Sequence, residues 1–527
     1  MLSTALRSIP LGLFLVLVLA AAGATAPAGR RDLVCNLPAE PLSLDPTYAS
    51  DPASYTLALN TFEGLTRLDG QNRPVPAMAK SWRISEDGLV YRFTLREARW
   101  SNGTPVTAGD FVFAWLRALA PGRAGERTHL LFVLANAEAY HKGAILDPAQ
   151  VGVKALDART LEVRLVKPAP HFLALCSLPP FFPLCRKVVE AAPQGWSLDP
   201  KTAVSNGPFR LGSYRPRRQI VLLANPYYWQ KDALRLESIT LTWLGSEEAA
   251  ASYRAGLLHV LLNPKPGLEG QEVAGVAPRL TYLLFNLKEP PFAQQLLRKV
   301  VANAIDRAAF VEAVGKDEIP AFAVVPPGIP DAAPGRDFRA TGGGMLLPDR
   351  DPNLARRFLS LAGHPNGEGL PELPFLFVPN PRNEKLVQIV AGNLAEVGLK
   401  IVPTPVKWGE FERRLSRGEF ALARVGWTAD YLDPHSFLAV FAGDSPANLG
   451  GYRSEAFDRA LAEADSAMDP VRRMAALHEA ESILLSDLPI LPVSFARTSF
   501  LVQPELKDVV SGPYGVPLFH RASFKAD

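Results

Sequence analysis

Apolar and polar residues alternate in short runs through the first half of the chain, which is the pattern of half-buried β-strands. Residues 91–96 and 161–166 follow this pattern, and residues 220–223 form a shorter apolar strand. Thr107 precedes apolar positions at helical spacing as far as Leu119, so it is the predicted N-cap of a helix. The first half is therefore predicted to be rich in strands.

The second half has a different pattern, in which helices and strands alternate. Residues 281–286 are expected to form a strand buried on both faces, and residues 294–314 one long helix. After a Pro- and Gly-rich loop at 320–352, the predicted elements are helices at 352–362, 383–397, 454–467 and 470–486, and strands at 374–378, 399–403, 490–495 and 499–502. This alternation predicts an α/β lobe with helices on a sheet.

Length and composition set the broad class of the protein. The chain has 527 residues, more than one compact core holds, so two or three lobes are expected. A composition of 48% hydrophobic and 21% charged residues is that of a folded protein and excludes extensive disorder. The formal net charge of +3 gives no indication of a nucleic-acid partner.

Residues 1–26 have the pattern of a signal peptide. Arg7 supplies a positive charge, residues 11–22 form an apolar run, and small residues before position 26 fit a cleavage site. The run is shorter than the roughly 20 residues of a membrane-spanning helix, and an uncleaved anchor is the alternative. No small residues precede Cys35, so no lipid anchor is expected. The mature protein is predicted to be exported and soluble.

The three cysteines give no metal pattern. Cys35 lies in an apolar run and is expected to be an inert thiol in a buried strand. Cys176 and Cys185 flank a Pro-rich segment, and in an oxidising compartment they either form a disulfide or remain two free thiols. The sequence leaves these two alternatives open.

Motifs of common catalytic and cofactor sites are absent. The chain has no Gly-x-Ser-x-Gly nucleophile elbow and no phosphate-binding loop that ends in Lys-Ser or Lys-Thr. His478-Glu479 begins like a zinc-binding helix, but Ser482 stands where the second histidine would be. No catalytic residue, cofactor or metal site is therefore predicted. A hydrolase that uses two carboxylates distant in sequence remains an alternative.

The segment 424–438 is the most informative for ligand binding. It places the carboxylate of Asp430 between two aromatic residues, Trp427 and Tyr431. A carboxylate with aromatic neighbours suits a positively charged ligand group, because the charge is neutralised and the rings exclude water. The alternative is a strand end followed by a turn, with Asp430 as a solvated turn residue.

A series of short motifs occurs in an order that resembles the solute-binding proteins of bacterial ABC importers. The resemblance is to the large peptide/nickel class, and within it to the oligopeptide-binding group. The motifs are Glu40-Pro-Leu-Ser-Leu-Asp-Pro46, Phe62-Glu-Gly-Leu65, Ala79-Lys-Ser-Trp82, Trp100-Ser-Asn-Gly-Thr-Pro-Val-Thr-Ala-Gly-Asp-Phe111, Asn206-Gly-Pro-Phe-Arg-Leu211, Asn225-Pro-Tyr-Tyr-Trp229, Ala304-Ile-Asp-Arg307 and Gly426-Trp-Thr-Ala-Asp-Tyr431. Each motif alone is weak, but their order over most of the chain is specific.

The resemblance implies an α/β, periplasmic-binding-protein-like fold (class II, cluster C) with two lobes and an additional inserted domain. The boundaries it implies are residues 29–65, 195–280 and 494–527 for a discontinuous lobe I, 66–194 for the inserted domain, and 281–493 for lobe II.

The function implied is capture of oligopeptides between the lobes and delivery to the membrane permease subunits. A periplasmic monomer that is not an enzyme and needs no cofactor is expected. Other cargo in the same fold (a dipeptide, a murein peptide, a nickel complex or a sugar), a secreted hydrolase, and a sensory or chaperone-like protein are the alternatives.

The resemblance also assigns roles to residues. Asp430 matches the acid that accepts the α-ammonium group of the peptide, and Tyr431 follows it. Arg424 matches an arginine that meets the peptide carboxylate, with an ion pair inside the lobe as the alternative. Trp408 and Trp427 match aromatics that line side-chain pockets, with a core role as the alternative, and Asn448 is expected to reach the peptide backbone.

The chain departs from the pattern at three positions. Thr428 replaces a cysteine of some relatives, so their disulfide cannot form here. Asn383 and Leu415 stand near positions where some relatives have a histidine and an arginine for the peptide C-terminus. The residues that hold the peptide C-terminus are therefore not assigned from the resemblance.

Overall fold

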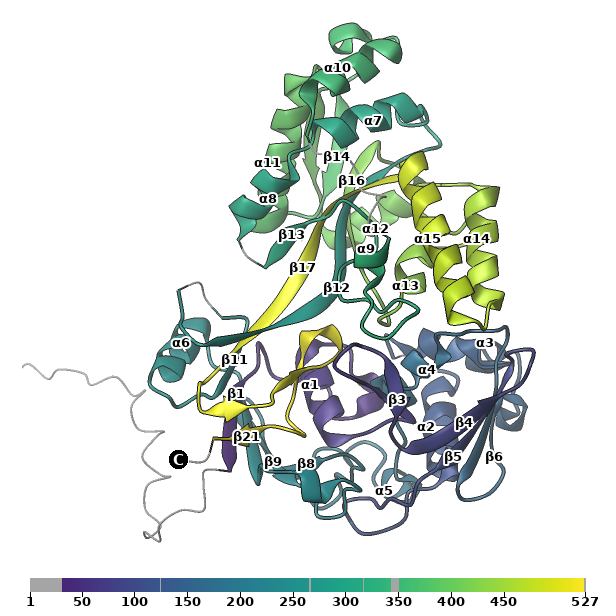
Figure 1. Cartoon of the computed structure of the whole chain (residues 1–527), viewed down its shortest axis with the longest axis vertical. Helices are drawn as coiled ribbons and strands as arrows, with labels where there is room; N and C mark the ends of the chain where they lie inside the picture. Colours follow the sequence, from purple (N-terminus) through teal and green to yellow (C-terminus); the bar gives the residue numbers. More distant parts are fainter. Residues whose placement is uncertain (1–30, 124, 265–266, 316, 343–349, 526–527) are drawn as a thin grey trace, which may run out of the picture.

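A computed structural model describes residues 31–123, 125–264, 267–315, 317–342 and 350–525 (Figure 1). The expected signal peptide, residues 1–26, lies outside the described residues. Among the described helices, none combines the length and the apolar character needed to cross a membrane.

One 11-stranded mixed sheet extends through most of the described molecule. Its strand order is β15-β14-β16-β12-β17-β11-β1-β10-β9-β8, and β13 pairs with β17 outside this path. The strands are β1 (Asp32–Asn36), β8 (Phe209–Arg215), β9 (Gln219–Ala224), β10 (Ser238–Thr242), β11 (Val260–Leu262), β12 (Gln271–Phe285), β13 (Glu318–Pro320), β14 (Leu373–Phe377), β15 (Ile401–Pro405), β16 (Leu422–Thr428) and β17 (Ile490–Val502).

The long strands β12 and β17 connect the upper and lower parts of the molecule (Figure 1). They pair antiparallel from Gln271 opposite Val502 to Leu284 opposite Ile490, with register shifts after Val276 and after Thr281. A register shift bends a strand locally. These two strands are therefore the covalent and hydrogen-bonded connection between the two halves of the sheet.

The upper end of the sheet carries most of the helices. Its buried residues run from Leu280 to Phe495, and we call this cluster the upper core. Helix starts have clear local causes: the Asp351 carboxylate accepts hydrogen bonds from two backbone N–H groups of α10, and Pro352 occupies its first turn. The helices are α7 (Gln295–Ala304), α8 (Arg307–Val314), α9 (Phe338–Thr341), α10 (Pro352–Leu361), α11 (Pro381–Glu396), α12 (Trp408–Arg417), α13 (His435–Leu438), α14 (Glu455–Ser466) and α15 (Pro470–Asp487).

A separate four-stranded sheet of order β4-β5-β7-β6 lies below it. Its core, here the four-strand core, contains buried residues from Phe62 to Val204 together with Tyr431. Thr107 and Asp110 form a capping box at the start of α2, and buried Trp115 on α2 donates to the Phe181 carbonyl at 2.9 Å. The elements are β4 (Ala79–Ile84), β5 (Val90–Leu95), β6 (Val153–Ala155), β7 (Thr160–Arg164), α2 (Ala108–Leu119), η3 (Thr128–Val133), α3 (Ala137–His141), α4 (Phe172–Leu175) and α5 (Arg186–Ala191).

The lower end of the large sheet forms a third cluster, the terminal core, which joins the two ends of the described chain. Leu33 of β1 and Phe519 near the C-terminus are both buried in it. The Asn60 side chain, on α1 (Pro52–Thr61), donates to the Pro517 carbonyl and accepts from the Phe519 amide, each at 2.9 Å. The chain therefore returns at its end to complete the part that it began.

Most predicted elements are confirmed, and the mixed α/β class with them. The predicted helix at 294–314 is wrong, because the chain turns at Ile305 and the Asp306 side chain caps a second helix, α8. The predicted strands at 490–495 and 499–502 are one continuous strand, β17, since β12 pairs along its whole length. The loop at 320–352 contains the short helix α9.

The sequence left open whether Cys176 and Cys185 form a disulfide or remain free thiols. Cys176 and Cys185 are both buried and free, so the structure has no disulfide between them. Cys35 is fully buried in β1, as expected, and burial raises the pKa of its thiol far above the ordinary value. A thiol that stays protonated is unreactive, which fits an inert core residue.

Candidate ligand-binding site

Asp430 lies two residues beyond the end of β16, in a turn fixed by hydrogen bonds. Its backbone N–H donates to the Ser436 hydroxyl at 2.9 Å. The Trp427 indole N–H donates to the Ser436 carbonyl at 2.8 Å, so the same serine holds both residues. The segment from the strand end to α13 is therefore a single hydrogen-bonded unit.

The carboxylate of Asp430 meets two cationic side chains from the four-strand part of the chain. Arg127 Nη1 donates to Asp430 Oδ1 at 2.8 Å, and His129 Nε2 lies 3.4 Å from Oδ2. Arg127 precedes η3, and the Asp430 side chain is 23% exposed. Asp430 therefore lies at the junction between the upper and four-strand cores, where its carboxylate is paired with Arg127 and His129.

A third part of the chain reaches the same residue. The Tyr514 hydroxyl, from the C-terminal segment, donates to the Asp430 carbonyl. Its ring meets Tyr55 edge-on with ring centres 5.1 Å apart, and the Arg127 guanidinium lies 5.6 Å from the centre of each ring. Burial raises the pKa of Tyr514 well above its usual range, so its hydroxyl stays protonated and donates.

The contact between His129 and Asp430 changes the pKa of the histidine. Its hydrogen bond to Asp430 is the main cause of a raised pKa of His129, and burial opposes this shift. The imidazole is half exposed, so solvent screens part of the interaction. The structure thus places one permanent cation and one titratable group on Asp430.

Tyr431 is directed into the four-strand core. Its side chain is buried, its hydroxyl pairs with His435 Nδ1 at 2.9 Å, and its ring stacks on that of His171 with centres 4.7 Å apart. Trp427 packs on the opposite side, against the upper core. The two aromatic neighbours of Asp430 in the sequence therefore join the two cores together.

A buried ion pair between Asp433 and Arg473 joins the turn at 430–436 to α15. Arg473 of α15 donates to both carboxylate oxygens of Asp433, at 2.9 and 2.7 Å, and both side chains are nearly inaccessible. Burial alone would raise the pKa of Asp433, but the charge and hydrogen bonds of Arg473 lower it to about 2. Such a bidentate pair holds the 430–436 turn in one position.

Arg424 lies inside β16, opposite Leu283 of β12. Its Nη2 approaches the Thr281 hydroxyl at 3.5 Å, and its Nε is buried with no hydrogen-bond partner among the described residues. Burial, with two neighbouring arginines, Arg382 and Arg279, lowers the pKa of Arg424 to about 10. The arginine remains charged at neutral pH, and within the described part of the chain it has no ion-pair partner.

The remaining predicted site residues lie elsewhere. Trp408 begins α12 and is 62% exposed, and its ring is 6.0 Å from that of Phe411. The Asn448 amide donates to the Ala442 and Tyr452 carbonyls and accepts from the Tyr452 N–H, so it holds the turn at 442–452. The structure brings Asp430, Trp427 and Tyr431 together, with Arg424 on the same strand.

A cavity of about 300 Å³ opens beside the Asp430 segment. It lies where all parts of the chain approach one another. Its lining includes Leu432, Ala274 of β12, the turn at 70–72, the loop at 328–337 and the C-terminal residues Ser511 and Gly512. Asp430 itself is not part of the lining, so the cavity adjoins the candidate site.

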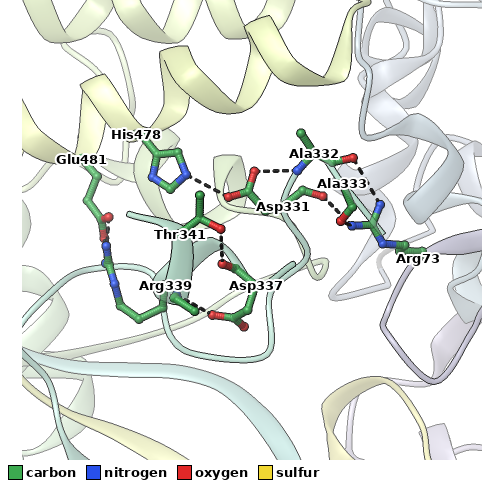
Figure 2. A network of polar contacts seen from close by, with 10 residues as sticks. Arg73, Asp331, Ala332, Ala333, Asp337, Arg339, Thr341, His478 and Glu481 are labelled. Carbon is green, nitrogen blue, oxygen red and sulfur yellow. Dashed lines mark hydrogen bonds and ion pairs between the residues drawn. The ribbon is translucent and has the colours of Figure 1, made fainter. Parts of the chain in front are cut away.

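Figure 2 shows how one wall of this cavity is held. Arg73, between β2 (Thr66–Leu68) and β3 (Pro74–Pro76), donates to the Asp331 carbonyl at 2.7 Å and also to the Ala333 carbonyl. On the other side of the loop, His478 of α15 meets the Asp331 carboxylate at 3.1 Å. Buried Glu481 accepts two hydrogen bonds of 2.8 Å from Arg339 of α9. The Arg73 contact therefore joins a rigid loop of the upper part to the β2–β3 hairpin.

The sequence pattern missed the partners of Asp430. Arg127 and Asp430 are 303 residues apart, and Tyr514 is a further 84 residues along the chain. No local signal marks Arg127 or His129 as part of a site, because their role depends on tertiary packing. Within the described residues, no group of three or more His, Cys, Asp or Glu side chains is arranged to hold a metal ion.

Comparison with known proteins identifies relatives over nearly the whole chain. The dipeptide-binding protein DppE of Bacillus subtilis is 32% identical over 93% of this chain and 91% of its own length. The periplasmic oligopeptide-binding protein OppA of Escherichia coli is 31% identical over 92% of this chain and 91% of its own.

Solved structures share the fold. The murein tripeptide-binding protein MppA in its unliganded open form superposes with a TM-score of 0.82, at 27% identity, over 94% of this chain and 98% of that structure. Listeria monocytogenes OppA bound to peptide gives a TM-score of 0.69, at 26% identity, over 95% of this chain and 100% of that structure. The expected two-lobed α/β fold with an additional domain is thereby confirmed.

The sequence profile of the family described as bacterial extracellular solute-binding proteins, family 5 (middle part), matches residues 73–448, well over half of the chain. With relatives above 30% identity along nearly its whole length, the chain belongs to the bacterial extracellular solute-binding proteins of family 5.

Proposed function

We propose that this protein is the substrate-binding component of an ABC importer and binds peptides that have a free amino end. The position of Asp430 carries the proposal. It is a partly exposed carboxylate where the upper, four-strand and C-terminal parts meet, in a chain whose relatives are named as peptide-binding proteins. A carboxylate at such a junction suits an ammonium group enclosed between lobes.

The arrangement of the lobes is more similar to an open structure of a relative than to two peptide-bound ones. Its TM-score is 0.82 with the unliganded open form of MppA, but 0.69 and 0.70 with two peptide-bound OppA structures. In this arrangement the Arg127 guanidinium forms an ion pair with the carboxylate of Asp430. On binding, the peptide ammonium takes the place of Arg127, so one charge-assisted hydrogen bond replaces another.

We also assign roles in ligand binding to the other predicted site residues. Arg424 is charged, buried and without an ion-pair partner among the described residues, which suits a carboxylate of the ligand. Trp427 and the exposed Trp408 supply apolar walls for ligand side chains. Asn448 holds its own turn, and we assign it a supporting role there.

The domain boundaries follow the same proposal. Lobe I comprises residues 29–65, 195–280 and 494–527, the inserted domain 66–194, and lobe II 281–493. The three hydrophobic clusters support this division, since each lies largely within one of these parts. Closure then takes place by bending at β12 and β17, the two strands shared by both lobes.

Its place in the cell follows from the same function. We propose export to the periplasm after removal of the signal peptide, action as a monomer, and delivery of intact ligand to the membrane permease. Binding is reversible and needs no covalent step or cofactor.

The test is to identify what the purified protein carries and whether an amine is required. Mass spectrometry after mild denaturation is expected to find short, intact peptides with free amino ends. In calorimetry, N-acetylation of such a peptide is expected to weaken binding at least about tenfold. The variant Asp430→Asn should remove this difference. Cleaved peptides would indicate a hydrolase, and equal binding of acetylated and free peptides would refute the role of Asp430.

A further inference from the structure

Two arginines pair with one buried glutamate beside β16, and Arg424 of β16 lies near one of them. Glu318 of β13 is buried, and a single carboxylate oxygen, Oε1, accepts a hydrogen bond from Arg279 Nη2 at 3.4 Å and forms an ion pair with Arg382 Nη2. Arg424 and Arg382 both donate to the Thr281 hydroxyl, at 3.5 and 2.9 Å. These side chains come from β12, β13, α11 and β16, so the fold assembles the cluster from four separate elements.

The cluster contains more positive than negative charge, and its polar atoms are incompletely paired. Arg424 Nε, Arg382 Nε and Glu318 Oε2 are buried without a hydrogen-bond partner among the described residues. Two guanidinium groups share one carboxylate oxygen, and Arg424 has no ion-pair partner among the described residues. Like charges held together in a partly buried site destabilise one another. The excess of positive charge and the unpaired guanidinium N–H groups suit an anionic group of a ligand.

The cluster is accessible from the side on which Asp430 lies. Side chains of a strand alternate between its faces, so Arg424, Gly426 and Thr428 share one face of β16, and Asp430 follows in the turn beyond the end of the strand. Gly426 and Thr428 are exposed. On β12, Arg279 lies opposite Thr428, and its side chain is 46% exposed. An open strip therefore leads from the cluster to Asp430.

The length of this strip sets the scale of the ligand. The strand part of this strip, from Arg424 to Thr428, is four residues long and rises about 3.3 Å per residue, so it covers roughly 13 Å, and the turn that holds Asp430 follows it. An extended peptide of about five residues has a similar length. Its amino end at Asp430 places its carboxyl end near the arginine cluster.

We propose that Arg382, with Arg279, binds a second carboxylate of the ligand, in addition to the terminal one assigned above to Arg424. The ligand class is therefore peptides with an acidic residue at the carboxyl end. This inference rests on the proposed function. Glu318 already neutralises part of the cluster, and the excess of guanidinium groups over carboxylates matches a chain end with two negative charges.

Arg382 is expected to strengthen the preference for an acidic C-terminal residue, and Glu318 to weaken it. Loss of the Arg382 guanidinium removes a donor to the second carboxylate. Loss of the Glu318 charge removes the internal anion that competes for the same donors. A purely structural role of the cluster predicts instead that both substitutions weaken binding of every peptide alike.

The experiment compares two alanine-rich pentapeptides that differ only in a C-terminal Glu or Gln, by titration calorimetry. The wild-type protein is expected to bind the Glu peptide at least about tenfold more tightly. Arg382→Gln should reduce this ratio to about twofold with little change for the Gln peptide, and Glu318→Gln should increase it. Arg357→Gln, an exposed arginine of α10, is the matched control.

The outcomes separate this inference from the proposed function. Equal binding of the two peptides by the wild-type protein would overturn the acidic preference and leave peptide binding intact. Binding of neither peptide would overturn the proposed function and the inference with it. If Arg382→Gln and Glu318→Gln change the ratio in the same direction, the cluster is structural and the inference is wrong; melting temperatures of both variants show that they are folded.

Discussion

Arg127 donates a 2.8 Å hydrogen bond to the carboxylate of Asp430, although 303 residues separate the two in sequence. The contact joins the four-strand part of the chain to the end of β16. The Arg127 guanidinium neutralises the carboxylate, so the residue proposed to anchor the peptide already has a cationic partner. An incoming ammonium therefore competes with a resident cation.

Removal of that competitor should strengthen binding. Arg127→Gln is expected to tighten binding of peptides with a free amino end by about tenfold, because a charge-assisted bond no longer has to be exchanged. N-acetylated peptides should bind as they do to the wild-type protein. Calorimetry of the two peptide forms checks this, with exposed Arg123→Gln as the control. Weaker binding of both forms would show that Arg127 contacts the ligand.

Binding should also depend on pH through His129. Its pKa is raised in the folded protein, chiefly by the Asp430 hydrogen bond, so the His129–Asp430 attraction is fully present below the ordinary value of about 6.5 and is lost as pH rises through the raised one. Protonated His129 competes with the peptide ammonium. Peptide affinity is therefore expected to fall as the pH is lowered from about 8 to about 6.

The variant His129→Gln should flatten this pH profile in calorimetry, since its side chain does not titrate. His364→Gln, at a half-buried histidine in the upper part, is the matched control and should retain the wild-type slope. A slope that persists in the His129 variant would assign the pH dependence to another group.

The buried pair of Asp433 and Arg473 should contribute strongly to stability. Arg473→Met leaves a buried carboxylate without its partner and is expected to lower the free energy of unfolding by about 3–5 kcal/mol. The neighbouring substitution Arg472→Met breaks only an exposed ion pair with Glu463 and should cost less than about 1 kcal/mol. Urea denaturation of both variants measures the difference, and equal losses would contradict the assignment.

The same pair has a definite dependence on acid. The pKa of Asp433 is lowered to about 2, so its contribution to stability is present above the unfolded value of about 3.9 and is lost as pH falls toward about 2. In the double variant Asp433→Leu with Arg473→Met, this part of the acid sensitivity should disappear.

Arg73 should limit the local opening of the loop shown in Figure 2. Arg73→Ala removes the donor to the carbonyls of Asp331 and Ala333, so residues 328–337 are expected to exchange amide hydrogens faster. Arg83→Ala, an exposed arginine of β4 in the same region of the sequence, is the control. Unchanged protection of the loop would show that α9 and α15 alone hold it.

The sequence predicted local structure well where one periodicity dominated. The helices at 352–362 and 454–467 agree with α10 and α14 to within a residue or two, because Asp351 and Ser454 cap them. The division at Asp306 was missed, since the apolar spacing continues across it. The unity of β17 was missed because only its pairing with β12 keeps the middle of the strand extended.

The candidate site was predictable only in part, for a physical reason. Asp430 and its aromatic neighbours are adjacent in sequence, so their pattern is visible, but Trp427 and Tyr431 turn into different cores. The partners Arg127, His129 and Tyr514 reach Asp430 only through the tertiary fold. The Glu318 cluster likewise depends on strand register, which no local pattern specifies.

The return of the C-terminus into the terminal core has a consequence for biogenesis. Leu33 and Phe519 share a cluster, and Asn60 bonds with the backbone at 517 and 519. The terminal core combines residues between 33 and 262 with residues between 500 and 522, so it cannot be complete until the second group has joined the first. The contiguous stretch from 280 to 495 has all its packing partners sooner. Maturation would therefore begin in the middle of the polypeptide and finish where its two extremities meet.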